Sequence, residues 1–262
     1  MSHEGRNILV YSDEGTSSVD VLIKSLESAL KSWELEGNTP TFKVCPVLAE
    51  DVLNGSCFQD ACLFVMPGGR DLPYVAKLEE QGVANIKDFV KRGGNYLGLC
   101  AGAYFASAFC EFEKGTEMEI CGARDLNFFP GKACGCVFPG FKYGTEEGSK
   151  IVSVMIQKTD FVKGEQLSFP CYYNGGCEFL FANSLSYDGV DVVAKYKEFP
   201  EKIAIVLCKI GQGNALLSGV HPEMDYKYIN RSKFTKEKLK LMEDISEAQR
   251  NLFHAILKLI LK

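Results

Sequence analysis

Short apolar runs alternate with segments of helical spacing over the first hundred residues of this chain. Four of the runs are predicted to be buried strands, at residues 7–13, 41–49, 61–69 and 95–100. Between them, apolar side chains recur at helical spacing over residues 17–33 and around 82–92. Strands that alternate with helices form a mostly parallel sheet with helices on both faces. The alternation therefore predicts an open α/β sandwich of three layers around a central, mostly parallel sheet.

The second half of the chain has a weaker alternation. Four further strands are predicted at residues 151–158, 191–198, 202–211 and 214–220. Turn-rich segments separate them, so several are expected to be antiparallel or mixed. Apolar residues near helical spacing over 235–262 predict one or two helices docked on the core. We expect a single domain over residues 1–262, with a core at about 7–230 and a C-terminal helical extension at about 231–262.

Composition and charge narrow the function classes. The chain is 46% hydrophobic and 24% charged, as in ordinary globular proteins, and its formal net charge of −5 gives no electrostatic reason to bind nucleic acid or an anionic membrane. No window holds the roughly 18 consecutive apolar residues that cross a bilayer, and the N-terminal segment does not resemble a secretory signal. An odd count of 11 cysteines without such a signal is typical of a reducing compartment. We expect a cytoplasmic protein with free thiols, no metal and no cofactor.

One cysteine stands in a special setting. Cys100 lies in GLCAG (residues 98–102), directly after a predicted strand and before a helix-forming stretch, which is the pattern of a nucleophile elbow. Two interpretations are open, because free cysteine is often simply a buried core residue. As a nucleophile, its thiolate would be favoured at a helix N-terminus. The backbone N–H of Ala101 and one from the turn at Gly68 and Gly69 would then bind the oxyanion of the attacked carbonyl.

A thiol nucleophile needs a base, and the chain has three histidines. His3 lies in the polar N-terminal segment, and His254 lies in the apolar C-terminal segment. His221 follows an apolar strand directly, so we expect it at a sheet end. Glu223, two residues on, would accept the other imidazole N–H and hold the ring in the tautomer that takes the thiol proton. The sequence predicts Cys100, His221 and Glu223 as a catalytic set.

These motifs resemble the class I glutamine amidotransferase superfamily, whose members carry a cysteine in a G-x-C-x-G elbow and a His-x-Glu after a later strand. The resemblance implies a flavodoxin-like sandwich, with Cys100 as nucleophile, His221 as base and Glu223 as the residue that orients it. Glutamine amidotransferases usually place a glutamine four residues after the nucleophile, where this chain has Tyr104. Glutamine is therefore not the expected substrate, and Tyr104 is expected to face the nucleophile.

A closer resemblance is to the N-terminal domain of eukaryotic, especially fungal, biotin-protein ligases and to stand-alone proteins built from it. The matching segments are ILVYSDEGT, VMPGGRDLPYV, YLGLCAGAYFAS, RDLNFFPG, YYNGG and AIVLCKIGQGNALLSGVHPE, in order over residues 8–223. The resemblance implies the fold and a pocket around Cys100. The chain shows no GRGR-type biotin-adenylate loop and no length for a ligase domain, so we expect it to biotinylate nothing.

The remaining candidate residues are assigned to substrate binding. Arg70, just after the glycine turn, would clamp a substrate carboxylate, or else form a salt bridge in a surface loop. Tyr173 and Asn174 in CYYNGG would enter the pocket as polar contacts, or else belong to a turn.

Three functions follow from these expectations. The first is a cysteine-dependent amide hydrolase or transferase that works through a thioester on a small-molecule substrate. The second is a small-molecule binding or regulatory module that keeps the three residues but turns nothing over. The third is an interaction subunit whose C-terminal helix docks on a protein partner such as a separate enzyme.

Overall fold

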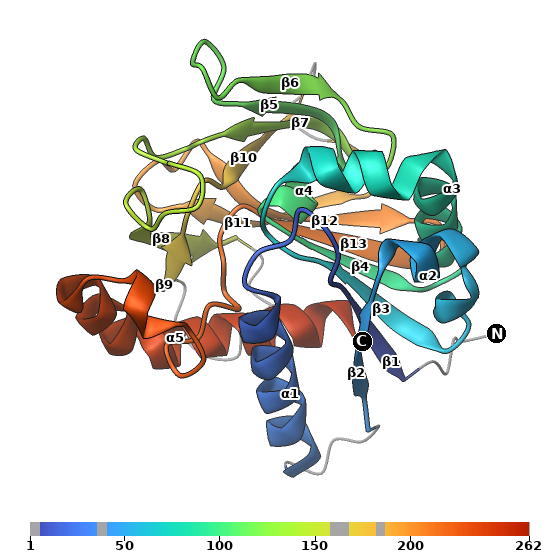
Figure 1. Ribbon diagram of the computed structural model, residues 1–262, viewed down its shortest axis with the longest axis horizontal. Coiled ribbons are helices and arrows are strands. Elements are labelled where there is room, and N and C mark those ends of the chain that lie inside the picture. Colours follow the sequence, from blue (N-terminus) through green and yellow to red (C-terminus); the bar gives the residue numbers. More distant parts are fainter. Residues whose placement is uncertain (1–5, 36–40, 158–167, 182–186, 262) are drawn as a thin grey trace.

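A large central sheet organises the molecule (Figure 1). The computed structural model describes residues 6–35, 41–157, 168–181 and 187–261. Within these residues nine strands form the sheet in the order β2-β1-β3-β4-β13-β12-β11-β8-β9. The strands are β1 (Asn7–Tyr11), β2 (Lys43–Val47), β3 (Ala61–Met66), β4 (Asn95–Leu99), β8 (Lys150–Ile156), β9 (Ser168–Tyr173), β11 (Val190–Tyr196), β12 (Ile203–Ile210) and β13 (Gly213–Ser218).

The strand directions divide the sheet into two parts. From β2 to β13 all neighbouring strands are parallel, and from β13 to β9 all neighbours are antiparallel. The α/β sandwich is thus confirmed, with the expected antiparallel strands in the second half of the chain. Lys158, the last position of the strand expected at 151–158, lies outside the described residues.

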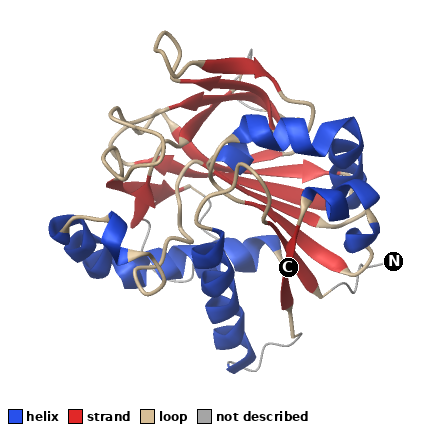
Figure 2. Ribbon diagram, viewed as in Figure 1, coloured by secondary structure: helices blue, strands red, loops and turns tan. Residues whose placement is uncertain are grey.

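Helices cover both faces of this sheet (Figure 2). They are α1 (Val19–Leu35), α2 (Ala49–Asn54), α3 (Asp71–Lys91), α4 (Ala101–Phe105) and α5 (Lys236–Ile260), with single turns η1 (Ser56–Phe58) and η3 (Arg231–Lys233). Successive strand residues point to opposite faces, so Ile8 and Val10 pack under α1 and α5, while Leu9 and Tyr11 pack under α2 and α3. Each face of the sheet therefore has its own apolar core.

A second, smaller sheet was not anticipated from the sequence. Its order is β10-β7-β5-β6, and it lies on the same side of the large sheet as α3 and α4 (Figure 1). The strands are β5 (Ser107–Phe112), β6 (Ile120–Ala123), β7 (Phe129–Gly135) and β10 (Cys177–Leu180). The pairing of β10 with β7 joins residues far apart in the chain, such as Phe179 and Ala133, which a local sequence pattern cannot predict.

Two boundaries differ from expectation. Helix α3 begins at Asp71 rather than near 82, and Glu79 has a non-helical backbone (φ 48°, ψ −166°) that divides it. Only its second half has the regular apolar spacing that the sequence pattern detects. In CYYNGG, Cys171–Tyr173 belongs to strand β9, so the turn is confined to the residues after it.

The C-terminal segment forms one long helix, α5, rather than two. Its apolar side chains Leu252, Ile256 and Ile260 are buried against the sheet, so the stripe that suggested a docking helix is covered by the chain itself. Lys262 lies outside the described residues. The single domain stays a prediction. No helix among the described residues is long and apolar enough to cross a membrane.

Candidate active site

Cys100 lies at the sharp junction between β4 and α4. Its backbone has φ 48° and ψ −103°, in a region that residues other than glycine rarely adopt, so the turn is strained. The flanking glycines permit this close turn. A Cβ on Gly98 would lie 2.6 Å from the carbonyl oxygen of Gly102, and a Cβ on Gly102 would lie 2.2 Å from that of Met66. The Cys100 side chain is thereby presented at the end of the strand, as in a nucleophile elbow.

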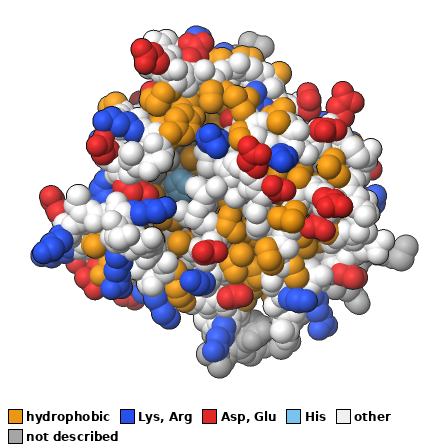
Figure 3. Space-filling model, in the orientation of Figure 1, with side chains coloured by type: hydrophobic (Ala, Val, Ile, Leu, Met, Phe, Trp, Pro, Cys, Tyr) orange, Lys and Arg blue, Asp and Glu red, His pale blue; other side chains and the backbone are white. Residues whose placement is uncertain are grey.

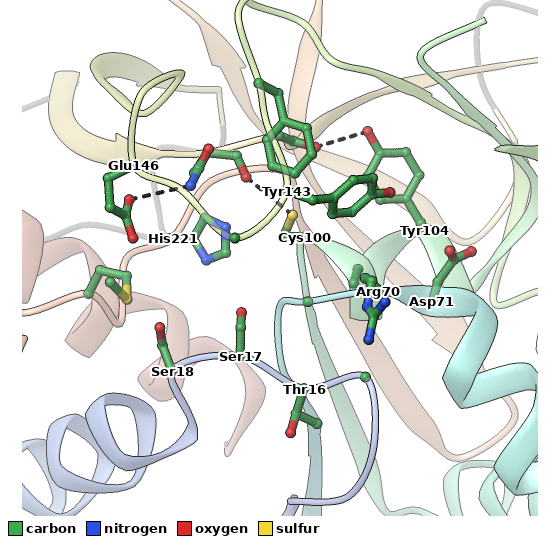
Figure 4. Close-up of a pocket in the computed structure, with 18 of the residues that line it drawn as sticks. Thr16, Ser17, Ser18, Arg70, Asp71, Cys100, Tyr104, Tyr143, Glu146 and His221 are labelled. Carbon is green, nitrogen blue, oxygen red and sulfur yellow. Dashed lines mark hydrogen bonds between the residues drawn. The ribbon is translucent and has the colours of Figure 1, made fainter. Parts of the chain in front are cut away.

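His221 follows the neighbouring strand, β13. The two strands are in parallel register, with Leu99 opposite Ser218, and the Cys100 N–H donates to the Ser218 carbonyl oxygen at 2.8 Å. The His221 N–H donates to the Tyr172 carbonyl oxygen at 2.9 Å. Adjacent strand ends therefore place Cys100 and His221 side by side, as Figure 4 shows.

Glu223 is hydrogen-bonded to the His221 ring. Its Oε1 is 2.7 Å from His221 Nδ1, and its backbone carbonyl accepts a hydrogen bond from the Ser25 hydroxyl at 2.8 Å. Both side chains are almost completely buried. Burial lowers the pKa of His221, but the Glu223 carboxylate and the neighbouring Cys100 outweigh this effect and hold that pKa well above its usual value. Glu223 thus increases the affinity of the imidazole for a proton beside the Cys100 sulfur.

Gly68 completes the contact between the two strand ends. A Cβ added there would lie 2.7 Å from His221 Cε1 and 3.6 Å from Cys100 Cβ. Any side chain at residue 68 would displace the His221 imidazole from its present position. The predicted residue Gly68 therefore packs directly against both members of the pair, behind the surface of the cavity.

A cavity of about 690 Å³ opens in front of Cys100 and His221. Five of the predicted binding residues line it: Gly69, Arg70, Ala101, Tyr104 and Asn174. Figure 3 shows a hollow on this face, with hydrophobic side chains gathered along its upper edge. The strand ends that the sequence marked as pocket walls thus meet at one cavity.

Two backbone amides in the cavity wall are candidate donors to a ligand. Among the described residues, neither the Ala101 N–H nor the Gly69 N–H donates a hydrogen bond within the protein. Ala101 is the first residue of α4, where an N–H has no partner inside the helix. Both groups remain available to an oxygen atom of a ligand bound at Cys100.

Tyr173 does not reach the cavity. Its side chain is fully buried in the core on the α1 and α5 side of the sheet. Its hydroxyl donates to the Gly176 carbonyl oxygen at 2.8 Å and accepts from the Phe138 N–H at 3.2 Å. Successive strand residues alternate in direction, so Tyr172 lines the cavity instead.

Arg70 is exposed at the cavity and forms no ion pair with any residue that the structure describes. Its neighbour Asp71 forms the buried ion pair of this turn, accepting from Arg124 Nε at 2.8 Å. The salt bridge considered for Arg70 is therefore absent from the described part of the chain, and its guanidinium is free to meet an anionic group.

The structure adds lining residues that the sequence did not single out. Ser17 and Ser18, in the loop between β1 and α1, direct their hydroxyls into the cavity from the side opposite His221 (Figure 4). The segment between β7 and β8 contributes Phe141, Tyr143 and Glu146. Ser17 and Ser18 follow the end of β1, so the argument that placed Gly69 at the cavity applies to them as well. The segment between β7 and β8 is a long connection without a motif, so the sequence does not single out its residues.

No group of three or more histidine, cysteine, aspartate or glutamate side chains in the described ranges is arranged to hold a metal ion. His3 lies outside these ranges.

Comparison with known proteins identifies related sequences. Residues 6–262 match the family described as "Biotin-protein ligase, N terminal". The chain is 37% identical over 226 residues to the biotin-protein ligase of Schizosaccharomyces pombe, a match that covers 83% of this chain and 33% of that protein. It is 34% identical over 223 residues to an uncharacterized protein of Chlamydia muridarum, covering 83% of this chain and 80% of that one. The chain thus spans about a third of the length of the yeast ligase.

Solved structures share the fold. A glutamine amidotransferase from Thermotoga maritima superposes with a TM-score of 0.60 at 12% identity, over 99% of both chains. A cytoplasmic protein from Salmonella typhimurium superposes with a TM-score of 0.53 at 12% identity, over 97% of this chain and 98% of that one. At such identities the likeness concerns the fold alone.

Proposed function

We propose, from the premise that this chain belongs to the biotin-protein ligase N-terminal family, that it is a cytoplasmic cysteine-dependent amide hydrolase or transferase. The observation that carries the proposal is the arrangement of Cys100, His221 and Glu223 at two adjacent strand ends. A buried glutamate bonded to one imidazole nitrogen, with a thiol beside the ring, is the arrangement that activates a cysteine nucleophile.

The chemistry follows from this geometry. His221 takes the proton of the Cys100 thiol, and the thiolate sulfur attacks the carbonyl carbon of an amide. The N–H groups of Ala101 and Gly69 bind the resulting oxyanion. The intermediate collapses by breaking the C–N bond, His221 returns the proton to the leaving amine, and an acyl thioester remains on Cys100.

The second half of the cycle regenerates the thiol. Water, or an acceptor amine in a transferase, attacks the thioester carbonyl while His221 accepts its proton. The carbon–sulfur bond then breaks, and the proton passes from His221 to the Cys100 sulfur. Glu223 stabilises the imidazolium in both halves. Arg70, exposed at the cavity, would bind an anionic group of the substrate, and Asn174 would supply a polar contact.

One observation favours the second candidate, a binding module without turnover. The Cys100 thiol donates a hydrogen bond to the Asn174 carbonyl oxygen at 3.7 Å, a contact that needs the S–H proton. In a binding module this contact would persist and Cys100 would react no faster than an ordinary thiol.

Pulse labelling with iodoacetamide at pH 6.5, followed by peptide mapping, separates the two candidates. For the enzyme we expect Cys100 to be alkylated at least about tenfold faster than the other ten cysteines, since an imidazolium neighbour favours the thiolate. His221→Ala should abolish this selectivity, while Cys121→Ser, which removes an exposed thiol, should preserve it. Uniform labelling of the accessible cysteines in the native protein would reject the enzyme in favour of the binding module.

A second measurement addresses the acyl step. Incubation with p-nitrophenyl acetate should release p-nitrophenol in a burst of about one equivalent, because the acetyl group is transferred to Cys100. Cys100→Ala should eliminate the burst. A burst of the same size in Cys100→Ala would assign the acylation to another side chain.

A further inference from the structure

Four aromatic side chains meet at one end of the cavity beside Cys100. Tyr104 comes from α4, Phe112 from β5, and Phe141 and Tyr143 from the segment after β7. The ring centroids of Tyr104 and Phe112 are 5.7 Å apart, those of Phe112 and Phe141 are 5.5 Å apart, and those of Phe141 and Tyr143 are 4.9 Å apart. All three pairs are edge to face, with interplanar angles of 83° to 86°. We call these four residues the aromatic subsite.

Glycines make room for the rings. A Cβ on Gly135 would lie 1.8 Å from the Tyr104 hydroxyl, and a Cβ on Gly175 would lie 2.7 Å from the Phe141 ring. Gly175 also has φ 75°, a conformation that other residues rarely adopt. These positions let the backbone approach the rings closely, so the subsite is built by several elements rather than by one surface loop.

The aromatic subsite is tied to the nucleophile by hydrogen bonds. The Tyr104 hydroxyl donates to the Gly175 carbonyl oxygen at 3.2 Å, and the preceding residue, Asn174, accepts from the Cys100 thiol (Figure 4). Tyr104 also lies one helical turn after Cys100. A group bound against the rings would therefore be attached close to the carbonyl that Cys100 attacks.

Exposure indicates a small-molecule ligand. Tyr104 is 3% exposed and Phe112 is 6% exposed, yet both line the cavity, while Tyr143 is 39% exposed at its rim. Asp71, a charged residue of the same cavity lining, is neutralised by Arg124. Two rings are thus reached only through the cavity, where a flat protein surface cannot contact them.

We propose that the aromatic subsite binds a planar apolar group of the substrate, so that the substrate is an amide carrying an aromatic ring near its reacting carbonyl. Edge-to-face packing against several rings stabilises such a group beyond the burial of its apolar area. A linear polar side chain gains nothing comparable and loses hydration against the rings. That the bound molecule is a substrate rests on the proposed function. The preference for an aromatic ligand follows from the four rings alone.

Binding is measured by calorimetric titration of the native protein with phenylacetamide, acetamide and glutaramide. We expect phenylacetamide to bind at least about tenfold more tightly than the other two amides. Tyr143→Ala and Phe141→Ala should each reduce this preference severalfold, because each removes one face of the subsite. Phe109→Ala is the matched control, since Phe109 lies in the same strand as Phe112 but outside the cavity lining. Equal binding of the three amides would overturn the inference.

A kinetic measurement separates the two proposals. Alkylation of Cys100 by N-benzyl-2-chloroacetamide should be at least about fivefold faster than by N-propyl-2-chloroacetamide, and Tyr143→Ala should bring the two rates together. If Cys100 reacts in a His221-dependent manner with equal rates for both reagents, and phenylacetamide shows no preference, the aromatic subsite is refuted and the proposed function stands. If phenylacetamide binds preferentially while Cys100 reacts slowly and independently of His221, the proposed function fails and the aromatic subsite stands as a ligand site.

Discussion

Gln249 Nε2 donates a 2.6 Å hydrogen bond to the carbonyl oxygen of Met224, the residue that follows Glu223. On its other side, Gln249 Oε1 accepts from the Tyr172 N–H at 2.7 Å. The side chain is 2% exposed and lies in the middle of α5. Helix α5 therefore holds together the loop that carries His221 and the strand that leads to Asn174, both of which contact Cys100.

Replacement of this side chain tests its positioning role. Gln249→Leu leaves the Tyr172 N–H and the Met224 carbonyl buried without partners, which should lower the free energy of unfolding by about 2–4 kcal/mol. It should also shift the pH profile of Cys100 alkylation, because the His221 loop loses its support. Urea unfolding and the alkylation profile measure the two effects.

Two further variants complete that test. Gln249→Glu keeps the acceptor for the Tyr172 N–H and should retain more of the native profile than the leucine variant. Lys240→Ala, an exposed substitution on the same helix, should change stability by less than about 0.5 kcal/mol. A loss of stability in Gln249→Leu with an unchanged pH profile would make Gln249 a structural residue only.

The ion pair of His221 and Glu223 predicts a pH-dependent stability. The pKa of His221 is higher in the folded protein than the value near 6.5 of the unfolded chain. The pair therefore contributes its full stabilisation below about pH 6.5, and this contribution is lost as the pH rises through the folded pKa. Glu223→Gln should be destabilised by about 1–3 kcal/mol near pH 6, with a smaller deficit near pH 9. Urea unfolding at both pH values, with exposed Glu243→Gln as control, measures it. A deficit that grows with pH would contradict the assigned protonation.

Gly68 should be intolerant of any side chain. A Cβ there would lie 2.7 Å from His221 Cε1, closer than real contacts allow, so the imidazole must move. Gly68→Ala should slow Cys100 alkylation at pH 6.5 at least about tenfold while costing only about 1–3 kcal/mol of unfolding free energy. Gly122→Ala is the matched control, because Gly122 lies outside the cavity lining and its nearest neighbour, Arg124 Nη1, is 3.3 Å from the added Cβ. Native alkylation rates in Gly68→Ala would show that the His221 ring position is unimportant for Cys100.

The parts of the site that were predictable share one physical origin. Cys100 and His221 each follow an apolar strand, and parallel strands end at the same edge of a sheet, so their local motifs were enough to expect one pocket. That β4 and β13 are direct neighbours depends on pairing across more than a hundred residues, which local patterns do not contain. Tyr173 shows the limit most clearly, because the register of β9 against β8 decides which of two adjacent tyrosines faces the cavity.

Of the aromatic subsite only Tyr104 was predicted, and the other three residues were missed for a related reason. Phe112 belongs to a strand of the smaller sheet, whose pairing partners are distant in the chain, and Phe141 lies in a connection with no regular pattern. From the sequence, aromatic residues in such segments are assigned to the core or to a loop. Their meeting at Cys100 follows from tertiary packing only.

Tyr104 leads to the last prediction, that the protein has little or no glutaminase activity. Its ring is 3% exposed, lines the cavity one helical turn after Cys100, and is held by the hydrogen bond to Gly175. It therefore occupies space that an extended glutamine side chain would need. A site that recognises a primary amide also needs a group that both donates and accepts, and a phenol on a flat ring is a poor match. Ammonia release from L-glutamine should stay at the level of Cys100→Ala, which serves as the blank.

Two variants show whether this one position decides the outcome. Tyr104→Phe keeps the ring, loses the bond to Gly175, and should remain inactive toward glutamine because the space is still filled. Tyr104→Gln removes the ring and supplies an amide, so a gain of ammonia release there would mean that the Cys100 elbow is competent and that its specificity was changed at residue 104. The larger cavity left in that variant should cost about 2–4 kcal/mol, so circular dichroism must first establish that it folds. Robust turnover of glutamine by the wild type that vanishes in Cys100→Ala would instead show that Tyr104 does not exclude glutamine. This end of the cavity would then prefer a polar group, and the inferred aromatic preference would be wrong.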